Sequence, residues 1–507
     1  MVNRFLQIAF ILCIISYILY GLASTLADPD LWGYLAFGRL FWNSSSFPYQ
    51  DVFSYVPTLN PWVYHEWLTG VVFYPIYQSL GAPGLQFLKY ALGLATLTFI
   101  YLTAVRRGAH PAVAGILLAA AAGAIKMSYS PVRAQVFTFF FFALSLYILE
   151  RARLSGRFRG LWLLPLIQIP WCNLHGGFVA GLGLIGIYAA GEFLARRPWL
   201  PYLGILLLSA LATLINPYGL EYWHYIVMAV AKPRPHVVEW ATVFELYQKG
   251  VYSILALFYV FLFVFLGLFA MWRYGWREVT ASLALAVTMV LGLKHNRHLT
   301  FFFILWGAYI PVCMNVQVNF VQSIPGLVKI WRGQAANLTL SVSLVALTLA
   351  FSYLLVQQNP LTLKLLSEPA RGHLHFPMDA VNYIKENGLS GKVVTRFAWG
   401  EYLIWELYPH CLVAFDGRYE TVYPEEVDQK YDEFHFARPK WRQFLESYPP
   451  DLILLDPNQE IAGLITKEPG WQKIYEDSGS VLFKKHAVNP VMNNKAFSTP
   501  EVGLKHK

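Results

Sequence analysis

Residues 5–26 read FLQIAFILCIISYILYGLASTL, and the chain continues through Ala27 into Asp28-Pro29-Asp30-Leu31-Trp32. The apolar stretch has about 20 residues, which is enough to cross the hydrocarbon core of a membrane. A cleaved signal peptide is the alternative, but its apolar core would be only about 7–15 residues long. We therefore expect a retained membrane helix, followed at once by an acidic loop.

The composition of the whole chain also indicates a membrane protein. Of its 507 residues, 56% are hydrophobic and only 14% are charged, whereas soluble domains carry about 25% charged residues. Long apolar runs predict eleven membrane spans, near residues 5–26, 84–105, 111–128, 134–150, 161–173, 176–194, 199–216, 251–272, 279–293, 299–316 and 337–356. Residues 68–80 are apolar but too short to span, which predicts a helix lying at the membrane surface.

The charges divide the chain into two parts. Residues 1–356 carry 22 Lys and Arg against 10 Asp and Glu, and residues 357–507 carry 17 against 20. We expect a transmembrane domain at 1–357, an α/β domain at 358–486 and a disordered tail at 487–507. The net charge of +9 comes from arginines in short loops beside the membrane, so it gives no reason to expect nucleic-acid binding.

The second part alternates between helix-like and strand-like segments. Helices are predicted at 378–386 and 425–434, and strands at 392–396, 412–415 and 452–455. Two further short strands flank the turn signal Asp477-Ser478-Gly479. No glycine-rich nucleotide loop follows any of these strands, which argues against an enzyme that uses a nucleotide sugar.

Loop charges predict how the chain crosses the membrane. With the N-terminus in the cytoplasm, 13 of the 22 basic residues of the first part fall in cytoplasmic loops, as the positive-inside rule expects. An odd number of spans then places the second domain outside the cytoplasm. The same arrangement directs seven acidic residues outward, namely Asp28, Asp30, Asp51, Glu66, Glu221, Glu239 and Glu245.

Asp28 and Asp30 are the first candidates for chemistry. Two carboxylates this close could share a divalent cation such as Mg²⁺ or Mn²⁺. Alternatively, one could act as a general base toward a hydroxyl group. The structural alternative is a helix N-cap, for which Asp30 is a good candidate.

Other polar residues of the outer loops are candidates for substrate binding. Lys126, Arg133 and Arg297 lie near predicted membrane ends, where cations can bind the phosphate of a lipid carrier or simply extend to the interface. The pair His65-Glu66 could transfer protons, hold a metal or form a loop salt bridge. His175 and Glu239 lie in the same set of loops and complete this group.

The first outer loop resembles that of the GT-C superfamily of polytopic glycosyltransferases. The similarity lies in Asp28-Pro-Asp-Leu-Trp32, Gly38-Arg39, Pro48, Asp51-Val-Phe-Ser54, Trp62 and His65-Glu66-Trp67-Leu68. The protein O-mannosyltransferases and the aminoarabinose transferases of lipid A are members. The resemblance implies a polyprenyl-phosphate-linked sugar donor, transfer on the outer face, and an Asp of this loop as base or metal ligand. Asp28 and Asp30 both match that position.

A second stretch resembles the acceptor-recognition region of the oligosaccharyltransferase catalytic subunit. It comprises Phe397-Ala-Trp399-Gly-Glu-Tyr-Leu403 and Phe415-Asp416-Gly-Arg418-Tyr419. The double Trp of that region is missing here, and Gly-Glu-Tyr stands where Asp-Tyr-Gly is expected. Trp399, Asp416 and Arg418 are the substrate-binding candidates from this stretch.

The function expected from the sequence is that of an integral glycosyltransferase of the inner or plasma membrane. It would transfer a sugar from a polyprenyl-phosphate donor to a glycan, lipid or protein outside the cytoplasm. Asp30 or Asp28 would be the base, and a divalent cation is possible. The rival interpretations are a transporter or flippase for a lipid-linked saccharide, and a scaffold that displays the second domain.

Overall fold

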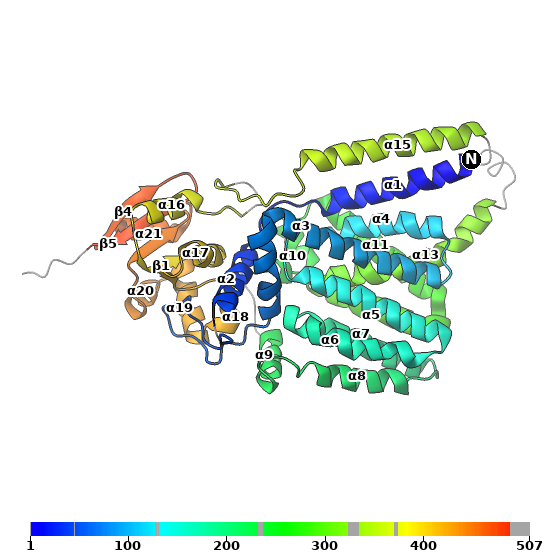
Figure 1. Ribbon diagram of the computed structural model, residues 1–507, viewed down its shortest axis with the longest axis horizontal. Helices are drawn as coiled ribbons and strands as arrows, with labels where there is room; N and C mark the ends of the chain where they lie inside the picture. Colours follow the sequence, from blue (N-terminus) through cyan, green and yellow to red (C-terminus); the bar gives the residue numbers. More distant parts are fainter. Residues whose placement is uncertain are drawn as a thin grey trace, which may run out of the picture.

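The computed structural model describes residues 2–44, 46–126, 129, 131–231, 237–322, 334–369 and 374–486. It shows a bundle of roughly parallel helices with a smaller α/β domain at one end (Figure 1). The predicted tail at 487–507 lies outside the described residues.

A helix lies in each of the eleven predicted spans. Among the described residues, six helices are long and apolar enough to cross a membrane, and four more are apolar but shorter. The helices of the bundle are α1 (Val2–Leu22), α3 (Trp67–Arg106), α4 (Pro111–Ile125), α5 (Gln135–Ser155), α6 (Leu163–Leu174), α7 (Phe178–Leu194), α8 (Leu200–Ala212), α11 (Ile254–Tyr274), α12 (Val279–Lys294), α13 (Leu299–Gln322) and α15 (Gln334–Gln357). The polytopic helical fold expected from the sequence is therefore confirmed.

Helix α3 joins two elements that the sequence predicts separately. The predicted surface helix at 68–80 and the predicted span at 84–105 form one element with a kink between them. Gly81 makes the kink, because its φ of 62° lies in the left-handed region that glycine adopts without strain. Pro83 follows two residues later and has no N–H to continue the hydrogen-bond ladder of the first segment.

Short helices cover the end of the bundle that faces the α/β domain. They are α2 (Pro29–Asn43), α9 (Leu220–Ala231), η2 (Val238–Trp240), α10 (Val243–Gln248) and η4 (Asn296–His298). Helix α2 packs against both α3 and α17 (Gly400–Leu407) of the second domain. The first outer loop is therefore enclosed between the two parts of the chain.

Ion pairs join the helices at the opposite end of the bundle. Arg107, at the C-terminus of α3, binds Glu150 of α5 at 2.6 Å and Glu278 at 2.9 Å. Arg153 of α5 binds Glu192 of α7 at 2.7 Å. Buried pairs of this kind are costly to break, because the remaining charge is left without a partner. They fix the relative positions of α3, α5, α7 and the start of α12.

The second domain contains a mixed five-stranded sheet in the order β2-β1-β3-β5-β4. Strands β2 and β3 lie parallel to β1 on either side of it. Strand β5 runs antiparallel to β3, and β4 runs antiparallel to β5. The strands are β1 (Gly391–Thr395), β2 (Cys411–Val413), β3 (Leu452–Leu455), β4 (Trp471–Glu476) and β5 (Val481–Lys485). The helices are α16 (Met378–Glu386), η5 (Phe397–Trp399), α17, α18 (Tyr419–Val422), α19 (Glu425–His435), α20 (Arg442–Ser447) and α21 (Glu460–Lys467). The predicted α/β pattern is confirmed.

Backbone pairing attaches this domain to the first outer loop. The amide N–H of Tyr55 donates to the carbonyl of Val413 in β2, and the Val413 amide donates to the carbonyl of Phe53. In the same way, Leu26 and Lys364 form an isolated parallel bridge, in which the Ala27 amide donates to the Lys364 carbonyl and the Lys364 amide donates to the Thr25 carbonyl. The loop thus lengthens the sheet by one short edge segment, which holds the domain against the bundle.

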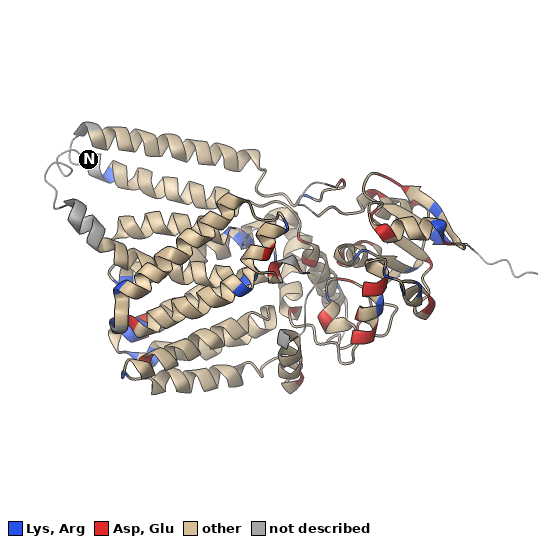
Figure 2. Ribbon diagram, turned by 180° about the vertical axis from the view of Figure 1, so that it is seen from behind, with Lys and Arg blue, Asp and Glu red and all other residues tan. Residues whose placement is uncertain are grey.

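Charged residues are distributed unevenly between the two ends of the bundle. Figure 2 shows basic residues concentrated at the end far from the α/β domain, and acidic residues where the bundle meets that domain. Arg107 and Arg153 share Glu278 at the far end, and Arg197 donates to the carbonyl of Arg277 there. The positive-inside rule places such an end in the cytoplasm.

We predict that the N-terminus is cytoplasmic and that the α/β domain is extracytoplasmic. Alkaline phosphatase fused after Phe376 should be active, because this enzyme folds only outside the cytoplasm. A fusion after Arg157 should be inactive, and a green fluorescent protein fusion at the same site should be fluorescent. An active phosphatase after Arg157 would reverse the orientation and place the acidic end inside the cell.

Candidate functional site

The site begins at the first turn of α2. Asp28 is the N-cap of this helix, and its side chain accepts a hydrogen bond from the amide of Asp30 at 3.1 Å. Pro29 occupies the first helical position, where a missing N–H costs nothing. The prediction that Asp30 is the cap is therefore wrong, and Asp28 has this role. Asp30 lies in the first turn, with 31% of its side chain exposed against 9% for Asp28.

Arg133 joins three carboxylates around this turn. Its Nη2 lies 2.7 Å from Asp30 Oδ2, and its Nη1 lies 2.8 Å from Glu239 Oε1. Its Nε lies 3.4 Å from Asp28 Oδ1. Arg133 lowers the pKa of Glu239, whereas burial raises the pKa of Asp28. Nη1 and Nη2 of this guanidinium each donate to a protein carboxylate, and the role of Arg133 as a phosphate ligand stays a prediction.

Glu66 lies on the same side of α2 and is buried between two histidines. His65 Nε2 is 3.6 Å from Glu66 Oε1, and His175 Nε2 is 3.4 Å from the same oxygen. Tyr34, one turn after Asp30 in α2, is a further polar neighbour of Glu66. Burial raises the pKa of Glu66. The predicted pair His65-Glu66 is thus part of a larger polar group rather than an isolated loop salt bridge.

The tautomer of His175 follows from its neighbours. Thr138 Oγ1 accepts from the indole of Trp171 at 2.8 Å, so its own proton is directed to His175 Nδ1, also at 2.8 Å. The amide of Gly177 donates to the same Nδ1 at 2.9 Å. Because Nδ1 accepts, the proton lies on Nε2, which faces Glu66. Burial lowers the pKa of His175 well below its usual range, so the ring is a neutral donor.

A fifth carboxyl group, that of Glu401, reaches the site from the α/β domain. Glu401 lies in the first turn of α17 and is buried. Its Oε2 accepts a hydrogen bond from the amide of Gly33 at 3.1 Å, and Gly33 lies one turn after Asp30. Burial raises the pKa of Glu401 well above its usual range, and the nearby charge of Asp30 adds to this effect. The second domain therefore forms part of the wall of the site.

The candidates from the second resemblance lie inside the protein. Asp416 and Arg418 form a close ion pair at 2.7 Å, and Arg418 also binds Asp51 of the first outer loop at 2.6 Å. The indole of Trp399 is buried and donates to the carbonyl of His375. These polar groups are bonded within the protein, and their role as direct substrate contacts stays a prediction. Arg418 also fastens the α/β domain to the first outer loop.

The other two predicted cations lie apart from this ion pair. The guanidinium of Arg297, in η4, lies 5.1 Å from the ring centre of Trp240 in η2, next to Glu239. Its charge contributes to the lowered pKa of Glu239, which places it beside the acidic group. Lys126 lies at the C-terminus of α4, over the ring of Tyr20 in α1 at 5.2 Å.

The residues around Asp28 and Asp30 do not fit a shared divalent cation. Such a site needs several oxygen ligands directed at one point. Here the guanidinium of Arg133 lies between the two carboxylates and supplies the positive charge. Within the described ranges, no group of three or more His, Cys, Asp or Glu residues could hold a metal ion. The predicted cation site at Asp28 and Asp30 is not supported.

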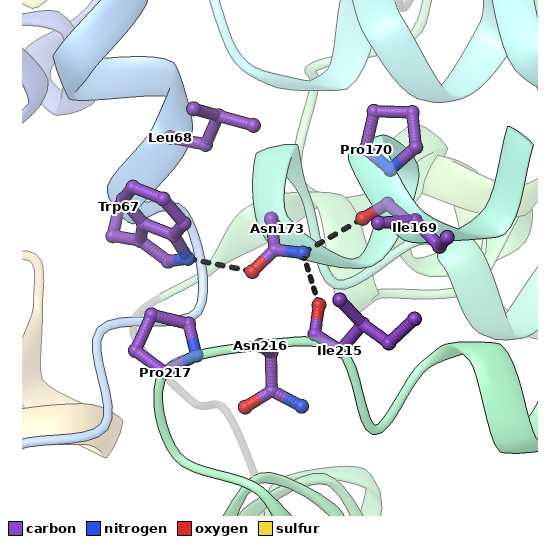
Figure 3. A pocket seen from close by; sticks show the side chains of 8 residues that line it. All are labelled: Trp67, Leu68, Ile169, Pro170, Asn173, Ile215, Asn216 and Pro217. Atoms are coloured by element: carbon purple, nitrogen blue, oxygen red, sulfur yellow. Dashed lines mark hydrogen bonds between the residues drawn. The ribbon is translucent and has the colours of Figure 1, made fainter. Parts of the chain in front are cut away.

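An apolar groove lies beside the polar group, near the outer ends of α6 and α8. It has a volume of about 520 Å³ and is lined by Trp67, Leu68, Ile169, Pro170, Asn173, Ile215, Asn216 and Pro217. Figure 3 shows Asn173 at its centre, where the amide accepts from the Trp67 indole and donates to the carbonyls of Ile169 and Ile215. Trp67 and Asn173 are close in sequence to Glu66 and His175, so the groove and the polar group are neighbours.

Comparisons with solved structures identify this arrangement. No protein-family model and no curated protein matches the sequence. The oligosaccharyltransferase of Archaeoglobus fulgidus, in a structure with zinc and sulfate, matches with a TM-score of 0.54 at 12% identity over 94% of this chain and 73% of that chain. ArnT of Cupriavidus metallidurans in the apo state gives 0.54 at 12% identity, over 95% of this chain and 97% of that chain. The chain has the GT-C fold.

A second ArnT structure, bound to undecaprenyl phosphate, matches with a TM-score of 0.50 at 12% identity over 96% of this chain and 98% of that chain. The resemblance inferred from the first outer loop is thus confirmed at the level of the fold. Because the GT-C fold holds many membrane glycosyltransferases, the chemistry of this chain must be argued from its own residues.

The structure brings together most of the predicted outer-loop residues and adds Glu401. Asp28, Asp30, Arg133 and Glu239 are in contact, and His65, Glu66 and His175 form the adjoining group. Glu401 stands within the stretch that resembles the acceptor-recognition region, in the second residue of Gly-Glu-Tyr. The signal that could have identified Glu401 is its position as an acidic residue between Trp399 and the apolar residues 402–405.

We predict that the Arg418→Met variant loses the attachment between the two domains. The change leaves the buried carboxylates of Asp51 and Asp416 without a cation, which should cost about 3–5 kcal/mol. Melting of purified protein in detergent should show a large loss of stability, partly restored by adding Asp51→Asn.

Arg442→Ala is the matched control for this prediction. Arg442 pairs with Glu468 on the exposed surface of the same domain, and surface pairs contribute little. Its melting temperature should stay near that of the wild type. Equal losses in Arg418→Met and Arg442→Ala would contradict the assigned role of Arg418.

Proposed function

We propose that this chain is a membrane glycosyltransferase that uses a polyprenyl-phosphate sugar as donor. The acceptor would be a hydroxyl of a glycan, lipid or protein outside the cytoplasm. One observation carries the proposal: Asp30 is a partly exposed carboxylate held in a largely buried polar group, at the acidic end of a GT-C bundle. A fixed carboxylate of this kind suits a general base.

Asp30 acts as the base in this proposal, and Asp28 holds the helix. Oδ2 of Asp30 accepts from Arg133, so the carboxylate has a fixed orientation. It takes the proton of the acceptor hydroxyl while the acceptor oxygen bonds to the anomeric carbon of the donor. The bond from that carbon to the phosphate oxygen breaks, and the electron pair leaves with the polyprenyl phosphate. Arg133 holds the Asp30 carboxylate in place through their direct ion pair.

Arg297 is the proposed ligand of the leaving phosphate. It follows the membrane helix α12 and lies over Trp240, on the same side as Glu239 and Arg133. A guanidinium can bind phosphate through two parallel hydrogen bonds. The structural neighbour ArnT, with undecaprenyl phosphate bound, supports a lipid phosphate as the donor class. Lys126 stays a second candidate at the outer end of α4.

His65, Glu66 and His175 are the proposed contacts to the sugar or acceptor hydroxyls. Nε2 of the neutral His175 faces Glu66 at 3.4 Å, and Tyr34 of α2 is a further polar neighbour of Glu66. This arrangement keeps donors and acceptors at fixed places beside Asp30. Such preorganisation contributes to catalysis because little rearrangement is needed when the substrate arrives.

We predict that Asp30→Asn abolishes transfer without a large loss of stability. Asn keeps the shape of the side chain but cannot take up the acceptor proton. Transfer from a radiolabelled polyprenyl-phosphate sugar should fall below about a tenth of the wild-type rate, a barrier increase of more than about 1.4 kcal/mol. Asp28→Asn should retain more activity, because Asn is also a good N-cap.

Glu245→Gln is the control for the Asp30 variant. Glu245 is an outward acidic residue in the capping box of α10, and Gln serves equally in that motif. This variant should transfer sugar at the wild-type rate. If Asp30→Asn does the same, Asp30 is not the base.

We predict that substitutions of Arg297 weaken use of the donor. Arg297→Lys keeps the charge but loses the planar pair of donors, and Arg297→Ala loses both. The apparent donor KM should rise or the rate fall in the order Lys, then Ala, with the acceptor KM unchanged. Equal specific activity of Arg297→Ala and wild type would remove Arg297 from the site.

A further inference from the structure

Glu401 is held against α2 by a contact that leaves no room for other side chains. Its Oε2 bonds to the Gly33 amide, and a Cβ atom at position 33 would overlap the same oxygen. On the other side, a Cβ atom at Gly417 would lie 2.6 Å from Glu401 Oε1. The carboxyl group therefore fills a slot between two glycines, one from each domain.

Asp30 lies close to this slot. The position of a Gly417 Cβ atom is 2.6 Å from Glu401 Oε1 and 3.7 Å from Asp30 Oδ1. The two carboxyl groups thus border the same small volume. Because Asp30 Oδ2 is engaged by Arg133, its other oxygen, Oδ1, is the one on the Glu401 side.

The charges around Glu401 are mainly negative. Asp30 of α2 and Glu66 before α3 face it from the membrane part, and Asp416 faces it from the loop after β2. Arg418 is the cation that acts to lower the pKa of Glu401. Its guanidinium, however, binds Asp416 and Asp51. Arg133 is already shared by Asp28, Asp30 and Glu239. A further buried negative charge here would have no cation of its own.

We propose that Glu401 is a positioning residue that works as a neutral carboxylic acid. Its Oε2 accepts from Gly33, and its Oε1–H donates to Asp30 Oδ1. This hydrogen bond orients the Asp30 carboxylate for proton uptake from the acceptor. The proposal rests on the proposed function in one respect, the role of Asp30 as base, and it assigns the α/β domain a direct part in the site.

Burial and the nearby acidic groups support the neutral form. They raise the pKa of Glu401 well above its usual range, which favours the protonated form. When the pH rises through that raised pKa, Glu401 ionises and the bond to Asp30 becomes a repulsion. Activity of the wild type should therefore fall on the alkaline side for this reason.

The first test compares Glu401→Gln with Glu401→Ala. Gln has an acceptor for the Gly33 amide and a donor for Asp30, and it cannot ionise. It should keep transfer within about threefold of the wild type, whereas Ala, which loses a bond to a charged group, should lower kcat by about tenfold to a hundredfold. The donor KM should change little in either variant. The alkaline fall in rate should disappear in Glu401→Gln.

Glu406→Gln is the matched control. Glu406 lies in the same helix α17, but it pairs with Lys385 at the surface. Its rate and its pH profile should match those of the wild type. If Glu401→Gln is as inactive as Asp30→Asn, or keeps the alkaline fall, Glu401 does not act as a neutral donor and the proposal is overturned.

Gly33→Ala tests the contact without changing either carboxyl group. Ala favours the helix, but its methyl group would displace the Glu401 carboxyl. The change should lower kcat in the wild-type background and have no further effect in Glu401→Ala, as expected for coupled neighbours. Equal losses of kcat in both backgrounds would show that Gly33→Ala does not act through Glu401, and would overturn the proposal.

Infrared difference spectra provide a test that needs no turnover. The spectrum of each purified full-length variant is subtracted from that of the wild type at neutral pH. The difference for Glu401→Gln should contain the C=O band of a protonated, buried carboxyl, and the difference for Glu406→Gln should not. An unchanged spectrum in Glu401→Gln would overturn the neutral form even if the enzyme transfers sugar. Conversely, a chain that cleaves no donor but shows this band would contradict the proposed function alone.

Discussion

The guanidinium of Arg133 is the interaction on which the outer site depends. It contacts Asp28, Asp30 and Glu239, which come from the start of α2 and from η2. Three carboxylates at this depth would repel one another and lose hydration without a cation among them. Arg133 allows them to lie together, and it orients Asp30 at the same time. It also takes the position between Asp28 and Asp30 that a metal ion would otherwise need.

The α/β domain is fixed to the first outer loop by direct contacts. Backbone bonds between Phe53, Tyr55 and Val413 extend the sheet, and Arg418 binds Asp51 across the junction. This attachment brings Glu401 to Gly33. A site built from both parts responds to changes in either one, so a substitution at Arg418 would also alter the proposed chemistry at Asp30.

The sequence predicted the membrane architecture well, because apolar length and loop charge are local signals. It also identified a set of outer-loop candidates, because ionisable groups near membrane ends are costly and usually serve a function. These are Asp28, Asp30, His65, Glu66, His175 and Glu239. The cap at Asp28 could have been predicted too, because Pro29 marks the first helical position. Its assignment to Asp30 ignored that rule.

Long-range pairing could not be read from the sequence in the same way. Arg133 and Asp30 are separated by 103 positions, and Gly33 and Glu401 by 368. No local pattern indicates which carboxylates a given arginine will bind, so Arg133 was assigned to a lipid phosphate. For the same reason Asp416 and Arg418 were assigned to substrate, although they bind each other and Asp51.

The central claim is that the outer site cleaves a lipid-linked sugar, and one measurement tests it most directly. The purified full chain is placed in vesicles that contain polyprenyl-phosphate sugars, and the lipids are analysed by mass spectrometry with and without an acceptor glycan. We predict that at least one donor is converted to free polyprenyl phosphate, with the sugar on the acceptor, and that Asp30→Asn leaves it intact. Donors that stay intact but move between the two leaflets would contradict the account and indicate a transporter.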